Sequence, residues 1–305
     1  MKKFWKKTSL FLVTAAMTVS APLMAWALEH DIVILHTNDI HCGINDNIGF
    51  AGLAQIKKDA LARTPNVALV DAGDAIQGAP IGKLSRGLAV VDIMNYLGYD
   101  FCIPGNHEFD YGMDRFLELV PLQRAGYYCA NFVYAGNNKQ VLPGYKIMQY
   151  EDTKVAFVGA STPESLTTST PTFFQNEKGK YIYSFCEDKT GNKLYKQLQK
   201  NVDKARKDGA DYVFIVGHLG MDGTTPQWSS ESVAKNTQGV DAVIDGHSHE
   251  RFTRMVKNKV GKDVLLAQTG TKLKTVGELV ITPNGKLKSQ LITESNGKDA
   301  NIARV

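Results

Sequence analysis

The chain has 305 residues, and its 43% hydrophobic content is enough to bury a substantial core. No linker rich in Ser, Gly or Pro divides it, so one main domain is predicted. The formal net charge of +4 arises from the first 27 residues, which hold four of the 35 basic residues and none of the 31 acidic ones. The rest of the chain is neutral and has no run of Lys and Arg, which removes charge as an argument for nucleic-acid or membrane binding.

Residues 1–27 are predicted to be a secretory signal peptide. Four lysines precede an apolar stretch at 10–19, and Ala25-Trp26-Ala27 has the small-x-small pattern of a cleavage site. A transmembrane anchor is the alternative, but the apolar stretch is short and interrupted compared with the roughly 20 residues of a spanning helix. No Cys follows the cleavage site to indicate a lipid anchor. We therefore expect an exported protein, periplasmic or extracellular, without a membrane anchor after cleavage.

Four cysteines, Cys42, Cys102, Cys129 and Cys186, would then lie in an oxidising compartment, where three complete disulfide pairings are available. Cys102 and Cys129 lie in apolar runs. We expect buried thiols there rather than disulfides.

Apolar runs and helical periodicity alternate through the first half of the chain. Gly98 is the expected C-terminal stop of one helix, and Pro121 should end or bend another. Strands are predicted at 31–35, 67–70, 101–103 and 127–132, and helices at 53–63, 88–97 and 113–119.

The second half continues in the same style and ends in strands, so an α/β fold is predicted. An antiparallel pair at 145–150 and 154–159 is followed by a lysine-faced helix at 194–208, buried strands at 212–216 and 240–244, and closing antiparallel strands at 264–268, 275–282 and 287–293. Residues 294–305 have the composition of a polar tail. The stretches 132–144 and 161–179 are expected to be long loops.

Polar side chains that can bind metal follow five of the predicted buried strands. Five of the seven histidines fall in these clusters, a concentration that scattered histidines would not produce. Each cluster alone is weak evidence for a metal site. Residues 105–110, for example, also have the composition of a polar turn. His36 is expected to be a structural neighbour and not a ligand. The clusters are Asp39 with His41, Asp74, Asn106 with His107, His218, and His247 with His249.

The number of ligands fits two divalent ions that share Asp74. One ion would take Asp39, His41, Asp74 and His249, and the other Asp74, Asn106, His218 and His247. The Asp-x-His and His-x-His spacings suit this, because residues two apart on an extended chain point to the same side. Two ions, two carboxylates and one hydroxide leave a positive charge, which favours an anionic substrate such as a phosphate ester. The ligand types suit Mn, Zn, Co or Fe and do not select among them.

The same residues carry a resemblance to a known family. The strings 36–41 (HTNDIH), 71–74 (DAGD), 105–110 (GNHEFD), 217–218 (GH) and 246–249 (GHSH) resemble those of the calcineurin-like metallophosphoesterases, in particular their 5′-nucleotidase and UDP-sugar hydrolase branch. The resemblance implies a four-layer αββα sandwich in a catalytic domain, which we place at 28–293, and it implies the two-ion site described above.

The resemblance also implies a mechanism, in which a metal-bridging hydroxide attacks phosphorus in line. His107 would not bind metal but would stabilise the developing charge or protonate the leaving oxygen, and Asp110 would orient its imidazole. Asn106 and His107 would contact the substrate phosphate. The expected function is therefore that of a secreted phosphohydrolase acting on small phosphoesters, nucleotides first.

Two departures from the family pattern bear on this expectation. Cys42 stands where the family commonly has Gly, which places a thiol near the metals. Family 5′-nucleotidases also have a C-terminal domain that recognises the nucleotide, and the sequence ends before such a domain, so a separate specificity subunit is one expectation.

Three alternatives remain open. Within the same branch, the chain could act as a cyclic-nucleotide phosphodiesterase or as an enzyme of the thiosulfohydrolase type. Outside enzymes, it could be a non-catalytic metal-binding or partner-binding module, although binding alone would not require His107 and Asp110.

Overall fold

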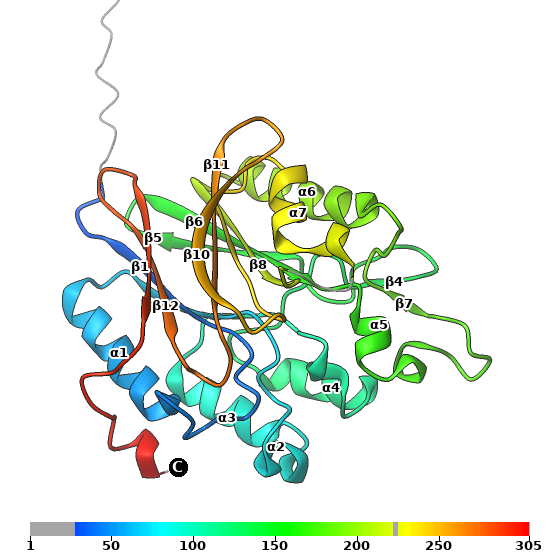
Figure 1. Cartoon of the computed structure of the whole chain (residues 1–305), viewed down its shortest axis with the longest axis horizontal. Helices are drawn as coiled ribbons and strands as arrows, with labels where there is room; N and C mark the ends of the chain where they lie inside the picture. Colours follow the sequence, from blue (N-terminus) through cyan, green and yellow to red (C-terminus); the bar gives the residue numbers. More distant parts are fainter. Residues whose placement is uncertain (1–27, 222–224, 305) are drawn as a thin grey trace, which may run out of the picture.

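The computed structural model describes residues 28–221 and 225–304, so the predicted signal peptide lies outside the described part. Two β-sheets face each other, with helices on the outer face of each (Figure 1). The first sheet has the strand order β13-β12-β1-β2-β3. Its strands β1 to β3 are parallel, and β12 and β13 add to β1 in antiparallel register. Its bounds are β1 Ile32–Thr37, β2 Val67–Asp71, β3 Phe101–Cys102, β12 Val276–Ile281 and β13 Leu287–Ile292.

The second sheet has the order β10-β11-β9-β8-β6-β5. Strands β6, β8, β9 and β11 are parallel, while β5 and β10 are antiparallel edges. Its bounds are β5 Tyr145–Tyr150, β6 Thr153–Ser161, β8 Tyr212–His218, β9 Ala242–Ile244, β10 Arg251–Lys257 and β11 Asp263–Thr269. A separate two-stranded ribbon pairs β4 Val133–Tyr134 with β7 Tyr183–Ser184.

The helices form the two outer layers. Helices α1, α3 and α4 cover the first sheet, and α6 and α7 cover the second on the opposite side of the molecule (Figure 1). The helices are α1 Gly49–Arg63, α2 Pro80–Ser85, α3 Leu88–Leu97, α4 Met113–Leu119, α5 Ser165–Thr168, α6 Asn192–Lys207 and α7 Ser230–Asn236. This arrangement is the predicted four-layer αββα sandwich. Within the described ranges, no helix is long and apolar enough to cross a membrane.

Strand β1 shows why the central strands are continuous apolar runs. Ile32 and Ile34 point into the core between the two sheets, whereas Val33 and Leu35 point into the core beneath the helices. All four are essentially inaccessible to solvent. A parallel strand that is covered on both faces has no polar side. Apolar and polar residues therefore do not alternate along β1, and the strand packs into a core on each of its faces.

One predicted strand is wrong. Residues 127–132 form only an isolated bridge between Tyr127 and Cys102, and the chain then crosses between the two sheets. The Tyr128 N–H donates to the Cys102 carbonyl (2.9 Å) and the Ala130 N–H to the Gly159 carbonyl (2.8 Å). The segment is apolar because it is buried between the layers, and not because it pairs along its length.

Two segments differ from expectation in smaller ways. Strand β10 was not predicted, and β11 is antiparallel to β10 but parallel to its other neighbour, β9. Near the chain's C-terminal end, the Asp299 N–H donates to the Ala51 carbonyl on α1 (2.9 Å), and Ile302 is 5% exposed in the helix-side core. Cys102 and Cys129 are buried free thiols, as expected, and Cys42 and Cys186 are buried free thiols as well.

Candidate active site

The predicted polar clusters meet at the carboxyl ends of strands from both sheets. The loops after β1, β2 and β3 bring the residues of the first half, and β8 and the loop after β9 bring those of the second half. Because these strands are parallel within each sheet, their carboxyl ends lie at one edge, where open α/β sheets bind ligands. Residues far apart in the sequence, such as Asp39 and His249, therefore lie side by side.

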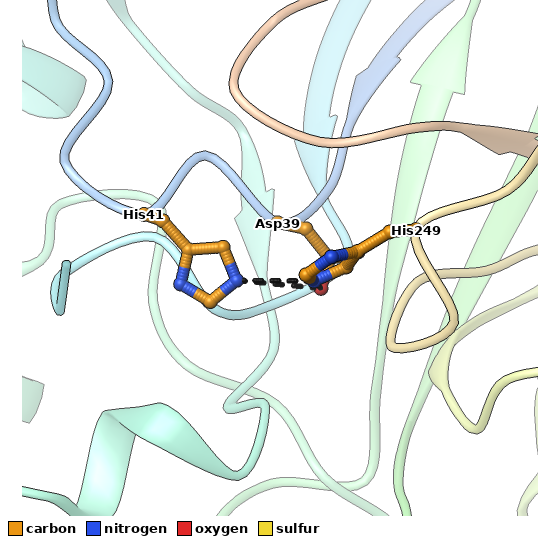
Figure 2. A group of neighbouring side chains, drawn as sticks. All are labelled: Asp39, His41 and His249. Carbon is orange, nitrogen blue, oxygen red and sulfur yellow. Dashed lines mark hydrogen bonds and ion pairs between the residues drawn. The ribbon is translucent and has the colours of Figure 1, made fainter.

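Asp39 lies at the centre of one group of side chains (Figure 2). Its Oδ1 is 3.2 Å from His249 Nε2 and 3.9 Å from His41 Nε2, and these two nitrogens are 3.2 Å apart. Asp39 Oδ2 accepts hydrogen bonds from the Asn38 side chain and the His247 N–H, whereas Oδ1 is buried and accepts none from the described residues. The orphaned oxygen is thus directed at two imidazoles.

His218 lies at the centre of a second group. Its Nε2 is 3.1 Å from Asp74 Oδ2, 3.2 Å from Asn106 Oδ1 and 3.9 Å from Asp39 Oδ1. Its Nδ1 lies 2.8 Å from the Ala72 carbonyl, which fixes Nδ1 as a donor and aims Nε2 at the oxygens. His218, Asp39 and Asp74 are all buried. Asp74 Oδ2 is also 3.9 Å from His41 Nε2, so Asp74 and Asp39 both lie between the two groups.

This donor set fits divalent metal ions. Imidazole nitrogens and carboxylate oxygens converge in two overlapping groups, Asp39 with His41 and His249, and Asp39 with Asp74 and His218. Asp39 Oδ1 accepts no hydrogen bond from the described residues, and His249 Nε2, 3.2 Å away, could pair with it only when protonated, so a bound cation would satisfy this buried oxygen while both imidazoles stay neutral. The geometry therefore suits the divalent ions that the sequence predicts.

The local electrostatics follow from burial and from these carboxylates. Burial lowers the pKa of His41 despite the nearby Asp74 and Asp39, which favours the neutral imidazole that a metal ligand requires. Burial also opposes protonation of His218, but Asp74 and Asp39 outweigh it and raise its pKa to about 10.

His247 directs a ring nitrogen at a carboxylate that is not one of the predicted ligands. Its Nε2 is 3.2 Å from Glu164 Oε2, and its ring lies against that of His218 with centroids 5.0 Å apart. Glu164 lies in the loop before α5, and its sequence context gave no signal of this contact. The structure therefore places His247 beside the second group without bringing it into the cluster.

His107 and Asp110 form the predicted pair outside the ligand groups. Asp110 Oδ2 lies 2.6 Å from His107 Nδ1, and Asp110 Oδ1 accepts from the Ser169 hydroxyl (3.0 Å). The hydrogen bond to Asp110 raises the pKa of His107 to about 9, against the effect of burial. The His107 ring is 5.3 Å from that of His41, so it adjoins the first group with its orientation fixed by Asp110.

The backbone at the site differs from the extended chain that the spacing argument assumed. Asp39, His41, Asp74, His247 and His249 all have positive φ, between 48° and 81°. The two-residue spacing still brings Asp39 and His41 together, but through a left-handed backbone and not through the same-side rule for strands. Such angles are unfavourable for side chains other than Gly, Asn and Asp, so surrounding hydrogen bonds must hold them.

Glu108 supplies such hydrogen bonds around Asp74 and was not predicted as a site residue. Its buried carboxylate accepts from four backbone N–H groups, those of Asp74 (2.8 Å), Ala75 (2.8 Å), Ile76 (3.3 Å) and Gly105 (2.6 Å). It thereby joins the loop that carries Asp74 to the loop that carries Asn106. The signal available in the sequence was an acidic residue within the string 105–110, which directly follows a predicted apolar strand.

His36 behaves as the predicted structural neighbour. Its ring is fully buried with both nitrogens unpaired among the described residues, and burial lowers its pKa to about 3. The ring lies over Gly277 of β12, where an added Cβ would be 1.9 Å from His36 Nε2. Its role is packing between neighbouring strands.

The fold and the paired donor groups define a metallophosphoesterase. Residues 32–251 match the model of the calcineurin-like phosphoesterase family, and the chain belongs to this family. It is 29% identical over 259 residues to a snake venom 5′-nucleotidase of Gloydius brevicauda, an alignment that covers 79% of this chain and 40% of the relative.

Two further comparisons agree with this family. The chain is 27% identical to a 2′,3′-cyclic-nucleotide 2′-phosphodiesterase/3′-nucleotidase of Haemophilus influenzae, over 78% of this chain and 40% of that protein. The structure of a 5′-nucleotidase precursor from Thermus thermophilus has the same fold, with a TM-score of 0.75, 24% identity and coverage of 90% of this chain and 57% of the other. The chain thus spans about 40% of the length of the curated relatives it matches.

Proposed function

We propose that this chain hydrolyses phosphomonoesters, with nucleotides as the preferred substrates, and that two divalent metal ions bind at the strand ends for this reaction. The observation that carries the proposal is the orphaned Asp39 Oδ1, which faces two imidazoles in a buried site that a cation would complete. A fixed His107–Asp110 pair next to this site adds the proton chemistry that a simple storage site would not need.

Seven side chains would hold the ions. Asp39, His41, Asp74 and His249 would hold one, and Asp74, Asn106, His218 and His247 the other, with His247 turning from Glu164 to do so. When bound, the ions would supply Lewis acidity toward the phosphoryl oxygens and lower the pKa of a coordinated water.

His107 and Asn106 would act on the substrate directly. The His107 imidazole, held by Asp110 through Nδ1, presents Nε2 as a donor toward the phosphate oxygens or the leaving oxygen. The Asp110 carboxylate keeps this tautomer and orientation, and Ser169 in turn fixes Asp110. This arrangement is the reason to prefer an enzyme over a non-catalytic binding module.

The nucleotide preference is supported by the relatives, several of which are 5′-nucleotidases. The similarity to the Haemophilus influenzae protein favours one second candidate, hydrolysis of 2′,3′-cyclic nucleotides. Export to the periplasm or the cell exterior is part of the proposal and rests on residues 1–27.

The test is hydrolysis of p-nitrophenyl phosphate by the purified chain with added Mn²⁺, Zn²⁺, Co²⁺ or Fe²⁺. We expect turnover that a chelator abolishes and that the metal restores, with metal content measured on the same preparation. A panel of nucleoside 5′- and 3′-monophosphates and 2′,3′-cyclic nucleotides would then rank the substrates. Failure to turn over any phosphoester with any of the four metals would contradict the proposal.

A further inference from the structure

Two cavities adjoin the segment 77–81, which follows the loop of Asp74. The first has a volume of about 700 Å³ and an apolar lining that includes Ile81, Ile93 and Tyr96. Its charged lining residues are Asp46 and Asp92, and among the described residues that line it there is no Lys or Arg. The second has about 680 Å³ and is lined instead by Lys83, Arg86, Asp110, Tyr111 and the hydroxyl residues 168–170, with Gln77 and Gly78. The two cavities thus offer opposite charges to a substrate.

The second cavity begins directly outside the catalytic residues. Asp110, one of its lining residues, lies 2.6 Å from His107 Nδ1. Gln77, another, places its carbonyl 3.2 Å from His41 Nδ1. A substrate with its phosphate at the proposed metal site and its leaving oxygen near His107 therefore has this cavity beside it.

The two cations in this cavity are exposed and have no carboxylate partner within the described part of the chain. Arg86 lies at the C-terminal end of α2 in a left-handed conformation, φ 47° and ψ 49°. Its guanidinium donates to the Tyr111 carbonyl (3.0 Å), and Arg115 donates to the carbonyls of Arg86 (3.0 Å) and Ser85 (3.2 Å). The end of α2 is thus fixed, and the remaining donors of Arg86 are available to a ligand.

The hollow continues beyond Arg86. A neighbouring cavity of about 360 Å³ shares Arg86 and Tyr111 and adds the aromatic residues Phe173 and Tyr183. We call these two adjoining cavities the groove: one carries Asp110 and the cations Lys83 and Arg86, and the other adds the aromatic residues together with Asp114 and Arg115. A phosphorylated leaving group with a ring at its far end matches this set of side chains.

We propose that this groove binds the leaving group of the substrate, and that the preferred substrate is a phosphomonoester whose leaving group carries a second phosphate. Lys83 and Arg86 bind the second phosphate, Arg86 through its planar fork of donors. The acidic lining of the first cavity repels such a leaving group and directs it to the second. This inference rests on the proposed function and specifies its substrate class.

The test compares p-nitrophenyl phosphate, AMP, adenosine 2′,5′-bisphosphate and adenosine 3′,5′-bisphosphate in kcat/KM assays at low salt. The variants are Lys83→Gln and Arg86→Asn, the latter chosen because Asn tolerates positive φ. We expect the wild type to prefer the two diphosphorylated compounds over AMP. Each variant should reduce that preference about three- to fivefold, mainly through KM, as about 1 kcal/mol of partly screened ion pairing predicts. The preference should also fall with added salt.

Two further variants serve as controls. Lys58→Gln removes an exposed lysine of α1 outside both cavities and should leave the preference unchanged. Asp92→Asn removes an acid of the first cavity. The inference is overturned if Lys83→Gln and Arg86→Asn affect all four substrates equally, or if Asp92→Asn alone changes the preference. Absence of aryl phosphate hydrolysis in the wild type would instead overturn the proposed function, and this inference with it.

Discussion

Replacement of Glu108 by Gln tests how the two central loops are held together. Each carboxylate oxygen accepts from two backbone N–H groups, Oε1 from Ala75 and Ile76 and Oε2 from Asp74 and Gly105. A Gln side chain has one carbonyl oxygen, so in either orientation its NH₂ group faces two N–H donors. Two buried donors then lose their acceptor at about 1–3 kcal/mol each. We expect Glu108→Gln to lower the free energy of unfolding by about 2–6 kcal/mol.

The assay is urea unfolding of the metal-free protein at neutral pH, followed by far-UV circular dichroism. The matched control is Glu118→Gln, which removes an exposed carboxylate of α4 that pairs with Arg115 (2.9 Å) and should cost less than about 1 kcal/mol. If Glu108→Gln loses no more stability than the control, the four backbone hydrogen bonds do not hold the two loops together. A native-like variant with weaker metal binding would likewise show that Glu108 does not act through these backbone contacts.

Three further substitutions separate catalysis, metal binding and packing. His107→Ala should lower kcat about 10²- to 10⁴-fold while metal content stays at the wild-type value, measured by kinetics and elemental analysis of one preparation. Asp39→Asn keeps a residue that tolerates the φ of 51° but removes the charge of the orphaned carboxylate. Calorimetric titration with Mn²⁺ should show weaker metal binding. The metal-free variant should be as stable as the metal-free wild type. Gly277→Ala brings a Cβ to 1.9 Å from His36 Nε2 and should destabilise the fold by about 1–3 kcal/mol or more in thermal unfolding, a loss that His36→Ala should partly relieve.

Each of these expectations has a clear contrary result. Wild-type turnover in His107→Ala would exclude the proposed proton-donor role. Undiminished Mn²⁺ affinity in Asp39→Asn would show that the orphaned oxygen is not a ligand. Wild-type stability in Gly277→Ala would show that the strand and the ring can move apart without cost.

Local signals were enough to predict several elements at their observed bounds. Helices α3, Leu88–Leu97, and α4, Met113–Leu119, have the predicted ends. In α3 the reason is visible, because Gly98 takes up the left-handed conformation that ends a helix. The αββα layering followed from the family resemblance and not from these local patterns.

Segments defined by distant contacts could not be predicted in this way. Strand β10, Arg251–Lys257, is largely exposed and rich in charge, and it is a strand because it pairs with β11 along its whole length. Residues 127–132 have a strand-like composition, but their hydrogen bonds go to two different sheets. In both cases the deciding partner lies elsewhere in the sequence.

The residues of the candidate site also differ in whether the sequence alone could predict them. Asp39, His41, Asp74 and the other proposed ligands stand in short strings at strand ends, so a single pass along the sequence finds them. Glu164, Lys83 and Arg86 stand in no such string, and only the folded chain brings them to His247 and to the groove beside Asp110. The residues that would bind the ions were thus readable from the sequence, whereas those that would select a substrate were not.

The left-handed backbone of the proposed ligands has a consequence for metal exchange. Five of these residues hold unfavourable φ angles, and backbone hydrogen bonds such as Asp39 N–H to the Gly73 carbonyl (2.9 Å) and His41 N–H to the Asp74 carbonyl (2.9 Å) keep them there. The free energy needed to hold these φ angles is therefore supplied by folding and not by metal binding. In small zinc domains, by contrast, folding and metal binding are a single event. If the site holds metal as proposed, one divalent ion could replace another on the folded scaffold, and the metal bound would depend on the supply around the protein.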